Sequence, residues 1–449
     1  MEFTTDAVLS LSPDDASAKA ARGLTSAGKW PTLGANTEAV WGECQGSGSK
    51  PYQTQVDLAG PAFRCSCPSR KFPCKHALAL LLIRCNEPTL FKATDAPAWV
   101  TQWLASRVQK QEKAEQRVVE KASAPPPSPQ DIEKRESRRW QTMQAGLDQL
   151  QLWMADHIER GIATLSSEQR EGFQTMAARL VDAQTTGLSQ RLKDTGEAVG
   201  RAPNWPERVL RTFGTLQLVA DAVAQREALP APAQADLKTA LGWAMDKADV
   251  LASGELLDDD FTVLGVAMQP LDVTAQSRGS KVTERRVWLQ GQRSGRRALL
   301  LDFSYGGAGF DSAWLVGRAY AMGLRFYPSA SPLRAVVGEQ RSAQVDSLAH
   351  TRSVPDEWLA MAQRCAGNPW LPLVPMLLAQ VTPAYHNKAW WLHMNNSAVP
   401  LRLGDEPGWL LAAYSGGQHV NLFGEWDGEQ LTPLTAWSSD GVWRNGELR

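Results

Sequence analysis

The sequence has no run of eighteen or more apolar residues, and its first residues lack a basic start followed by an apolar core. The first absence argues against a membrane-spanning helix, and the second predicts that no leader exports the chain. We therefore expect a cytoplasmic protein without membrane contacts. Cysteine is also scarce, with 6 among 449 residues, so a disulfide framework of the secreted type is not expected.

A strong charge of either sign is missing as well. The formal net charge is -1, so no overall basic field attracts nucleic acid, and any such contact must come from a local patch. Hydrophobic residues make up 43% of the chain, which is enough for globular domains with buried cores, and the length predicts two to four of them.

Complete enzyme motifs are absent too. Residues 23–30 have the spacing of a phosphate-binding loop, but Trp30 stands where Ser or Thr would hold magnesium and Pro31 obstructs the helix that should follow. The glycines at 307–309 lack the third glycine of a dinucleotide loop and predict a tight turn. The acidic run Asp258–Asp260 predicts a solvated turn. We therefore predict that the protein is not an enzyme. If it is one after all, we expect its active site in a cleft between the middle and C-terminal parts.

Half of the cysteines lie in one short segment together with a histidine. Cys65 and Cys67 are two apart, so on a strand both thiols point to one side, while Cys74 and His76 stand at the start of an apolar helix. Three thiolates and an imidazole match a closed structural site for one Zn²⁺, with no position left for a catalytic water. The alternative is buried free cysteines and one satisfied histidine. Cys44 is either a core residue or a secondary ligand.

The spacing C-x-C-x₆-C-x-H followed by an apolar helix resembles the SWIM zinc finger of bacterial proteins, and residues 41–58 resemble the strand, turn and strand that precede its ligands. The resemblance implies binding of protein or DNA. Bacterial relatives accompany MoxR-type AAA+ ATPases and von Willebrand type A proteins, so it implies an adaptor with a partner of that kind. The alternative function is a DNA-binding protein that uses the basic surface of the finger.

Basic residues surround the predicted ligands. Arg64, Arg70, Lys71, Lys75 and Arg84 lie between Pro61 and Cys85 without an acidic residue. The first four are the candidate contacts to nucleic-acid phosphates. Alternatively, the cations balance the negative charge of a zinc ion with three thiolates, and we favour this slightly because the rest of the chain is neutral.

The chain is predicted to be an α+β multidomain protein. Residues 1–105 form a zinc-stapled module of β-hairpin and helix, in which the apolar helix is covered by Trp99, Val100, Trp103 and Leu104. A charged and proline-rich linker spans 106–130. An apolar stripe from Trp140 to Ile158 begins a helical domain over 131–255. Residues 256–449 form an α+β domain with an antiparallel sheet.

Tryptophan is abundant, with 18 in the chain. Trp390 and Trp391 are adjacent in a predicted strand, so they point to opposite faces of the sheet. At least one of them then faces away from the main core unless both faces are covered. We predict this pair as a partner-binding surface.

Overall fold

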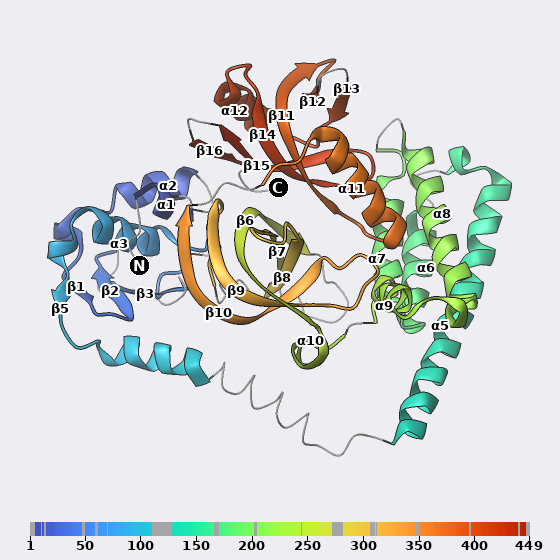
Figure 1. Cartoon of the computed structure of the whole chain (residues 1–449), viewed down its shortest axis with the longest axis horizontal. Coiled ribbons are helices and arrows are strands. Elements are labelled where there is room, and N and C mark those ends of the chain that lie inside the picture. The colour runs from blue at the N-terminus through green and yellow to red at the C-terminus, as the bar shows by residue number, and fades with distance from the viewer. Residues whose placement is uncertain are drawn as a thin grey trace.

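The computed structural model shows a small module and a helical bundle on opposite sides of a β-barrel, with a second sheet above the barrel (Figure 1). It describes residues 5–9, 11–12, 15–46, 50–58, 62–69, 71–109, 128–165, 170–201, 204–243, 245–271, 282–305, 310, 312–346, 350–394, 397–438 and 441–445. Most of the predicted linker and the glycines at 307–309 lie outside these residues. None of the described helices combines the length and the apolar character that a bilayer crossing requires.

The N-terminal module is a five-stranded sheet with three helices on the side of one face and the helical residues 98–109 on the other face. Its strands follow the order β4-β3-β2-β1-β5, and all neighbours are antiparallel except β1 and β5. The elements are α1 (Thr5–Leu9), α2 (Asp15–Arg22), β1 (Thr32–Ala35), β2 (Ala39–Cys44), β3 (Tyr52–Asp57), β4 (Ala62–Cys65), α3 (Lys75–Asn86) and β5 (Lys92–Ala93). The order α2 then β1 around residues 23–30 is the reverse of the strand and helix that frame a phosphate-binding loop.

The apolar helix α3 is the centre of this module. Residues 76–83 are all buried, as expected for a helix without a polar face. Its cover differs from the prediction: α1 and α2 pack on α3 from one side and strands β2 to β4 from the other. Val100, with Trp99 and Leu104 beside it, instead packs on Ala39 and Trp41 of the sheet. The prediction was wrong because periodicity shows that a helix is buried but not which neighbour buries it.

The middle part is the predicted helical bundle. Its helices are α5 (Pro129–Arg160), α6 (Arg170–Asp182), α7 (Thr186–Ala198), α8 (Trp205–Ala224), α9 (Ala231–Ala240) and α10 (Lys247–Ser253). Ser128 caps α5, where its hydroxyl accepts a hydrogen bond from the Asp131 amide at 3.1 Å. The stripe from Met143 to Met154 is buried in one core with side chains of α6 to α9, whereas Ile158 at its end is exposed.

The C-terminal part contains two sheets where one was predicted. Strands β6 (Glu255–Leu271), β7 (Val282–Gly291), β8 (Arg297–Tyr305), β9 (Arg318–Phe326) and β10 (Arg334–Asp346) close a barrel in the order β10-β8-β7-β6-β9. Only the β10–β8 pair is parallel. This pair joins strands that are not consecutive in the chain, so turn signals did not reveal the closure.

The second sheet is the predicted antiparallel one. Its order is β13-β12-β11-β14-β15-β16, with β11 (Val374–His386), β12 (Ala389–Met394), β13 (Ser397–Pro400), β14 (Val420–Trp426), β15 (Leu431–Ser438) and β16 (Gly441–Arg444). Helix α11 (Val354–Gly367) precedes it, and α12 (Asp405–Ser415) interrupts it. The turn-rich pattern over 389–443 gave no sign of α12.

Buried polar contacts join the barrel to this sheet. Glu425 on β14 accepts hydrogen bonds from Arg286 on β7 at 2.7 and 2.9 Å and from the Trp288 indole at 2.7 Å. Glu425 is 2% exposed. The N-terminal module also meets the barrel region, because Leu315, just before β9, lies in the hydrophobic core that contains α3.

The acidic run Asp258–Asp260 is not a solvated turn, because it lies within β6. The Asp259 side chain is buried and accepts hydrogen bonds from the backbone amides of Arg293 at 3.1 Å and Ser294 at 2.9 Å. Burial alone would raise the pKa of Asp259, but these hydrogen bonds outweigh it and lower that pKa. Asp259 therefore fixes the turn between β7 and β8.

Candidate metal centre

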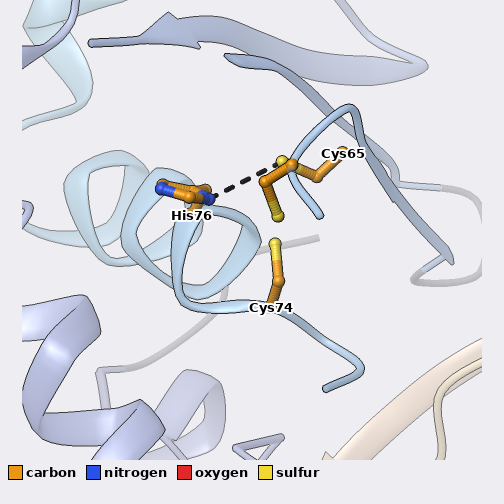
Figure 2. A group of neighbouring side chains, drawn as sticks. Cys65, Cys74 and His76 are labelled. Carbon is orange, nitrogen blue, oxygen red and sulfur yellow. Dashed lines mark hydrogen bonds between the residues drawn. The ribbon is translucent and has the colours of Figure 1, made fainter. Parts of the chain in front are cut away.

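The four predicted ligands come from two elements that meet at one point. Cys65 ends β4 and Cys67 follows it, while Cys74 is the N-cap residue of α3 and His76 lies in the first turn of that helix. The thiols of Cys65 and Cys74 and the His76 ring point toward one another (Figure 2). The strand and the helix are thus tied together at the place where each of them ends.

The distances suit one tetrahedral ion. One ligand atom from each of Cys65, Cys67, Cys74 and His76 lies within 4.8 Å of all the others. The Cys65 sulfur is 3.8 Å from Nδ1 of His76. Zinc bonds of about 2.3 Å to sulfur and about 2.0 Å to nitrogen separate tetrahedral neighbours by roughly 3.6–3.8 Å. The side chains therefore need only small movements to close around Zn²⁺.

The charges of the three thiols also call for a cation. Hydrogen bonds with Cys65 and then Cys74 lower the pKa of Cys67, while hydrogen bonds with Cys65 and then Cys67, together with burial, raise the pKa of Cys74. The cluster on its own thus favours one thiolate stabilised by neighbouring thiols. A divalent cation at the centre would stabilise all three thiolates, and its binding would release the remaining protons.

Neighbouring side chains hold the ligands in place. Thr54 on β3 is fully buried, and its hydroxyl lies 3.2 Å from the Cys65 sulfur, so it can donate a hydrogen bond to the thiolate. The Tyr52 ring packs on the His76 ring with 5.0 Å between centroids. His76 is 5% exposed and Cys74 is 6% exposed. Water therefore has little access to this side of the cluster.

The other cysteines lie outside the four-residue group. Cys44 on β2 is fully buried in the core around α3, and burial raises its pKa to about 11. Burial likewise raises the pKa of Cys85 to about 11. Cys44 is thus a core residue and not part of the ligand cluster.

The predicted basic contacts are only partly described. Arg64, Lys71 and Lys75 are exposed, and Arg70 lies outside the described residues. The charge of Lys75 lowers the pKa of the nearby Cys44, as does that of Lys29. Arg84 packs over the Phe91 ring at 5.8 Å. Lys75, which stands between Cys74 and His76, therefore lies beside the ligands and can balance the zinc–thiolate charge, while Arg64 and Lys71 extend the positive surface.

The tryptophan pair does not form an open surface. Trp390 is 2% exposed and belongs to the core of the six-stranded sheet, and Trp391 is half-buried. Two exposed aromatic rings pack on Trp390: Trp409 on α12, which is 55% exposed, with 5.0 Å between centroids, and Tyr385 on β11, which is 41% exposed, with 4.9 Å. Strand alternation indicated opposite faces for the pair but could not show that α12 covers the Trp390 face.

Comparison with known families supports the identity of the cluster. A family model described as SWIM zinc finger matches residues 52–85, and one described as SWIM-associated four-helix bundle domain matches residues 138–241. Searches of curated proteins and of solved structures give no match. The first match spans β3, β4, the four ligands and most of α3, and the second spans the core of the bundle. Cys65, Cys67, Cys74 and His76 are therefore the ligands of one structural Zn²⁺.

Proposed function

The chain carries a SWIM zinc finger followed by a SWIM-associated four-helix bundle domain, and from this premise we propose that it is a non-catalytic adaptor that binds a protein partner. Its zinc-binding domain is of a kind used for protein or nucleic-acid interaction. The adaptor role is supported above all by the closed ligand set, because three thiolates and an imidazole leave no position for a substrate or a catalytic water.

The placement of the finger fits this role. The module lies against the barrel region through Leu315, while Arg64, Lys71 and Lys75 remain on its outer surface. Across the described residues, the finger is the one place where three or more metal-ligating side chains gather. We propose a MoxR-type AAA+ ATPase or a von Willebrand type A protein as the partner, acting in the cytoplasm.

Direct titration tests the proposal. Zinc-loaded full-length protein is titrated by calorimetry with the MoxR-type ATPase and with the von Willebrand type A protein encoded in the same genome. We expect a saturable complex of fixed stoichiometry with one of them, weakened when Trp409 is replaced by alanine. Leu218→Ala, an exposed apolar residue of α8, is the matched control. If the protein binds neither of the two and a pull-down recovers no stoichiometric partner, the adaptor function is excluded.

A nucleic-acid interface is the second candidate, and the exposed cations Arg64, Lys71 and Lys75 favour it. Binding of a 20-base-pair duplex, measured by fluorescence anisotropy, should then weaken steeply with salt, with a slope of about -0.9 per phosphate contacted. Lys71→Ala combined with Lys75→Ala should reduce both affinity and slope, while Lys247→Ala, an exposed lysine on α10, should change neither. No retention of the duplex at 50 mM salt would eliminate this function.

A further inference from the structure

A cavity of about 550 Å³ lies where the bundle meets the segment between α11 and β11. Helices α7, α8 and α9 form one wall, and Asn368 to Pro372 form the other. The volume falls within the range of about 300–1,000 Å³ that is typical of small-molecule sites. The cavity thus lies at the junction of the middle and C-terminal parts, which is where the sequence predicts any overlooked site.

Buried hydrogen bonds fix the second wall. Asp236 on α9 is 4% exposed and accepts hydrogen bonds from the Asn368 side chain at 2.7 Å and from the Ala330 amide at 2.8 Å. The Asn368 side-chain oxygen accepts one from the Trp370 amide at 3.1 Å. Trp370 itself packs in the core of the bundle. The cavity is therefore preformed, and Trp370, Leu371 and Pro372 give it an apolar side.

Arg191 on α7 lines the cavity without a counter-charge. Its Nη2 donates to the Trp370 carbonyl oxygen at 3.3 Å, and no carboxylate in the described part of the chain forms an ion pair with it. Arg208, the other arginine of the lining, differs because Glu429 pairs with it at 3.2 Å. Burial lowers the pKa of Arg191. A guanidinium with five N–H donors thus lines the cavity, and only one of these donors has a hydrogen-bond partner among the described residues.

The two threonine hydroxyls of the lining satisfy each other. The Thr195 hydroxyl donates to the Arg191 carbonyl oxygen at 2.8 Å, so across the 3.1 Å contact between the two hydroxyls Thr212 on α8 donates to Thr195. Asp194 also lines the cavity, and its carboxylate accepts a hydrogen bond from Gln190 at 2.8 Å. Arg191, which has no ion-pair partner among the described residues, therefore sets the chemistry of a ligand.

We propose that this cavity binds a small organic anion, a carboxylate or a phosphate monoester, whose charged group pairs with Arg191 and whose apolar body lies on Trp370, Leu371 and Pro372. The fork of the guanidinium matches both kinds of oxyanion. The anion stabilises the junction between the bundle and the C-terminal part, because it supplies the negative charge that Arg191 lacks. This site is independent of the zinc finger.

Thermal unfolding and calorimetry of the full-length zinc-loaded protein test the site. The probes are benzoate and phenyl phosphate, and benzyl alcohol is the uncharged control of similar size. We expect at least one anion to raise the melting temperature saturably and benzyl alcohol to leave it unchanged, with the better anion distinguishing carboxylate from phosphate. Arg191→Met should weaken binding at least tenfold. Lys193→Gln, which removes a positive charge from the same helix outside the cavity, should retain it.

The variants also separate a ligand site from a structural role. Because the Arg191 charge is desolvated without a carboxylate, Arg191→Met should melt no lower than the wild type in the absence of anions. A marked loss of stability would show that Arg191 is structural. Arg191→Lys, which keeps the positive charge, should bind the anion more strongly than Arg191→Met. Absence of binding by both anions, or equal binding by wild type and Arg191→Met, would overturn the proposal.

Discussion

The Cys65 sulfur lies 3.8 Å from Nδ1 of His76, although the first residue ends a strand and the second begins a helix. The metal ligands thus connect the two element types of the finger. Cys67 and Cys74 complete the cluster from the short segment between them. The first predictions test how much of the finger depends on this contact.

Loss of one ligand should release the metal and unfold the finger locally. Cys74→Ser leaves two thiolates and an imidazole, and structural zinc contributes about 10–16 kcal/mol to the folding of comparable finger peptides. Metal analysis should give one zinc per chain in the wild type and nearly none in the variant, and hydrogen exchange should increase in β3, β4 and α3. Cys85→Ser, a thiol on the same helix outside the cluster, should keep its zinc.

Thr54 should tune the affinity for zinc. Its buried hydroxyl lies 3.2 Å from the Cys65 sulfur, and loss of such a hydrogen bond to a ligand typically weakens metal binding by about 10–100-fold. Thr54→Val should therefore lose zinc at lower chelator concentrations in a competition titration, while Thr54→Ser should behave like the wild type. Equal zinc affinity of Thr54→Val and the wild type would mean that the hydroxyl does not support the thiolate.

Asp259 should stabilise the barrel in a pH-dependent way. Its pKa is lowered in the folded state, below the value of about 3.9 in an unfolded chain. The carboxylate then contributes stability above pH 4, and this contribution is lost as the pH falls through the lowered pKa. Asp259→Asn should lower the free energy of unfolding by about 2 kcal/mol at pH 7. Denaturant titrations at pH 3 should find a smaller difference between the two proteins.

Glu425 should be essential to the joint between barrel and sheet. Glu425→Gln removes one of the two carboxylates that pair with the buried Arg286, and Glu284 keeps its ion pair with the guanidinium, so the free energy of unfolding should fall by about 1–3 kcal/mol. The double variant Glu425→Leu with Arg286→Met should recover part of this loss, because it removes both buried charges and leaves only Glu284, which is 18% exposed, without its partner. If the single and double variants were equally destabilised, shape and not charge would govern the joint.

The sequence predicted the metal centre correctly because its four ligands lie within twelve positions of the chain. A strand with alternate thiols and a helix that starts at Cys74 are local features, so spacing alone indicated how they converge. The apolar stripe of α5 could be predicted in the same way, since the apolar residues from Met143 to Met154 recur with the period of a helix.

Features that depend on contacts between distant parts of the chain could not be predicted from the sequence. The barrel closes through the parallel pair of β10 and β8, which no hairpin signal marks. Trp390 is buried because α12 lies on its ring, and a Cβ added at Gly408 would come within 2.2 Å of that ring. The sequence shows a glycine inside an apolar helix but not the strand that it touches. Arg191 belongs to no sequence motif, and its place in the lining of a cavity is evident only from the structure.

The position of Leu315 bears on how the chain is threaded. Leu315 lies in the core of the finger, and Asp236 of the bundle contacts Asn368 and Ala330. The finger and the bundle, which residues 110–127 connect along the chain, are therefore also connected through the C-terminal part. We therefore expect that the finger and the bundle stay associated even when the chain is cut between them. A protease that cuts this stretch should yield two fragments that elute together from a sizing column until strong denaturant separates them.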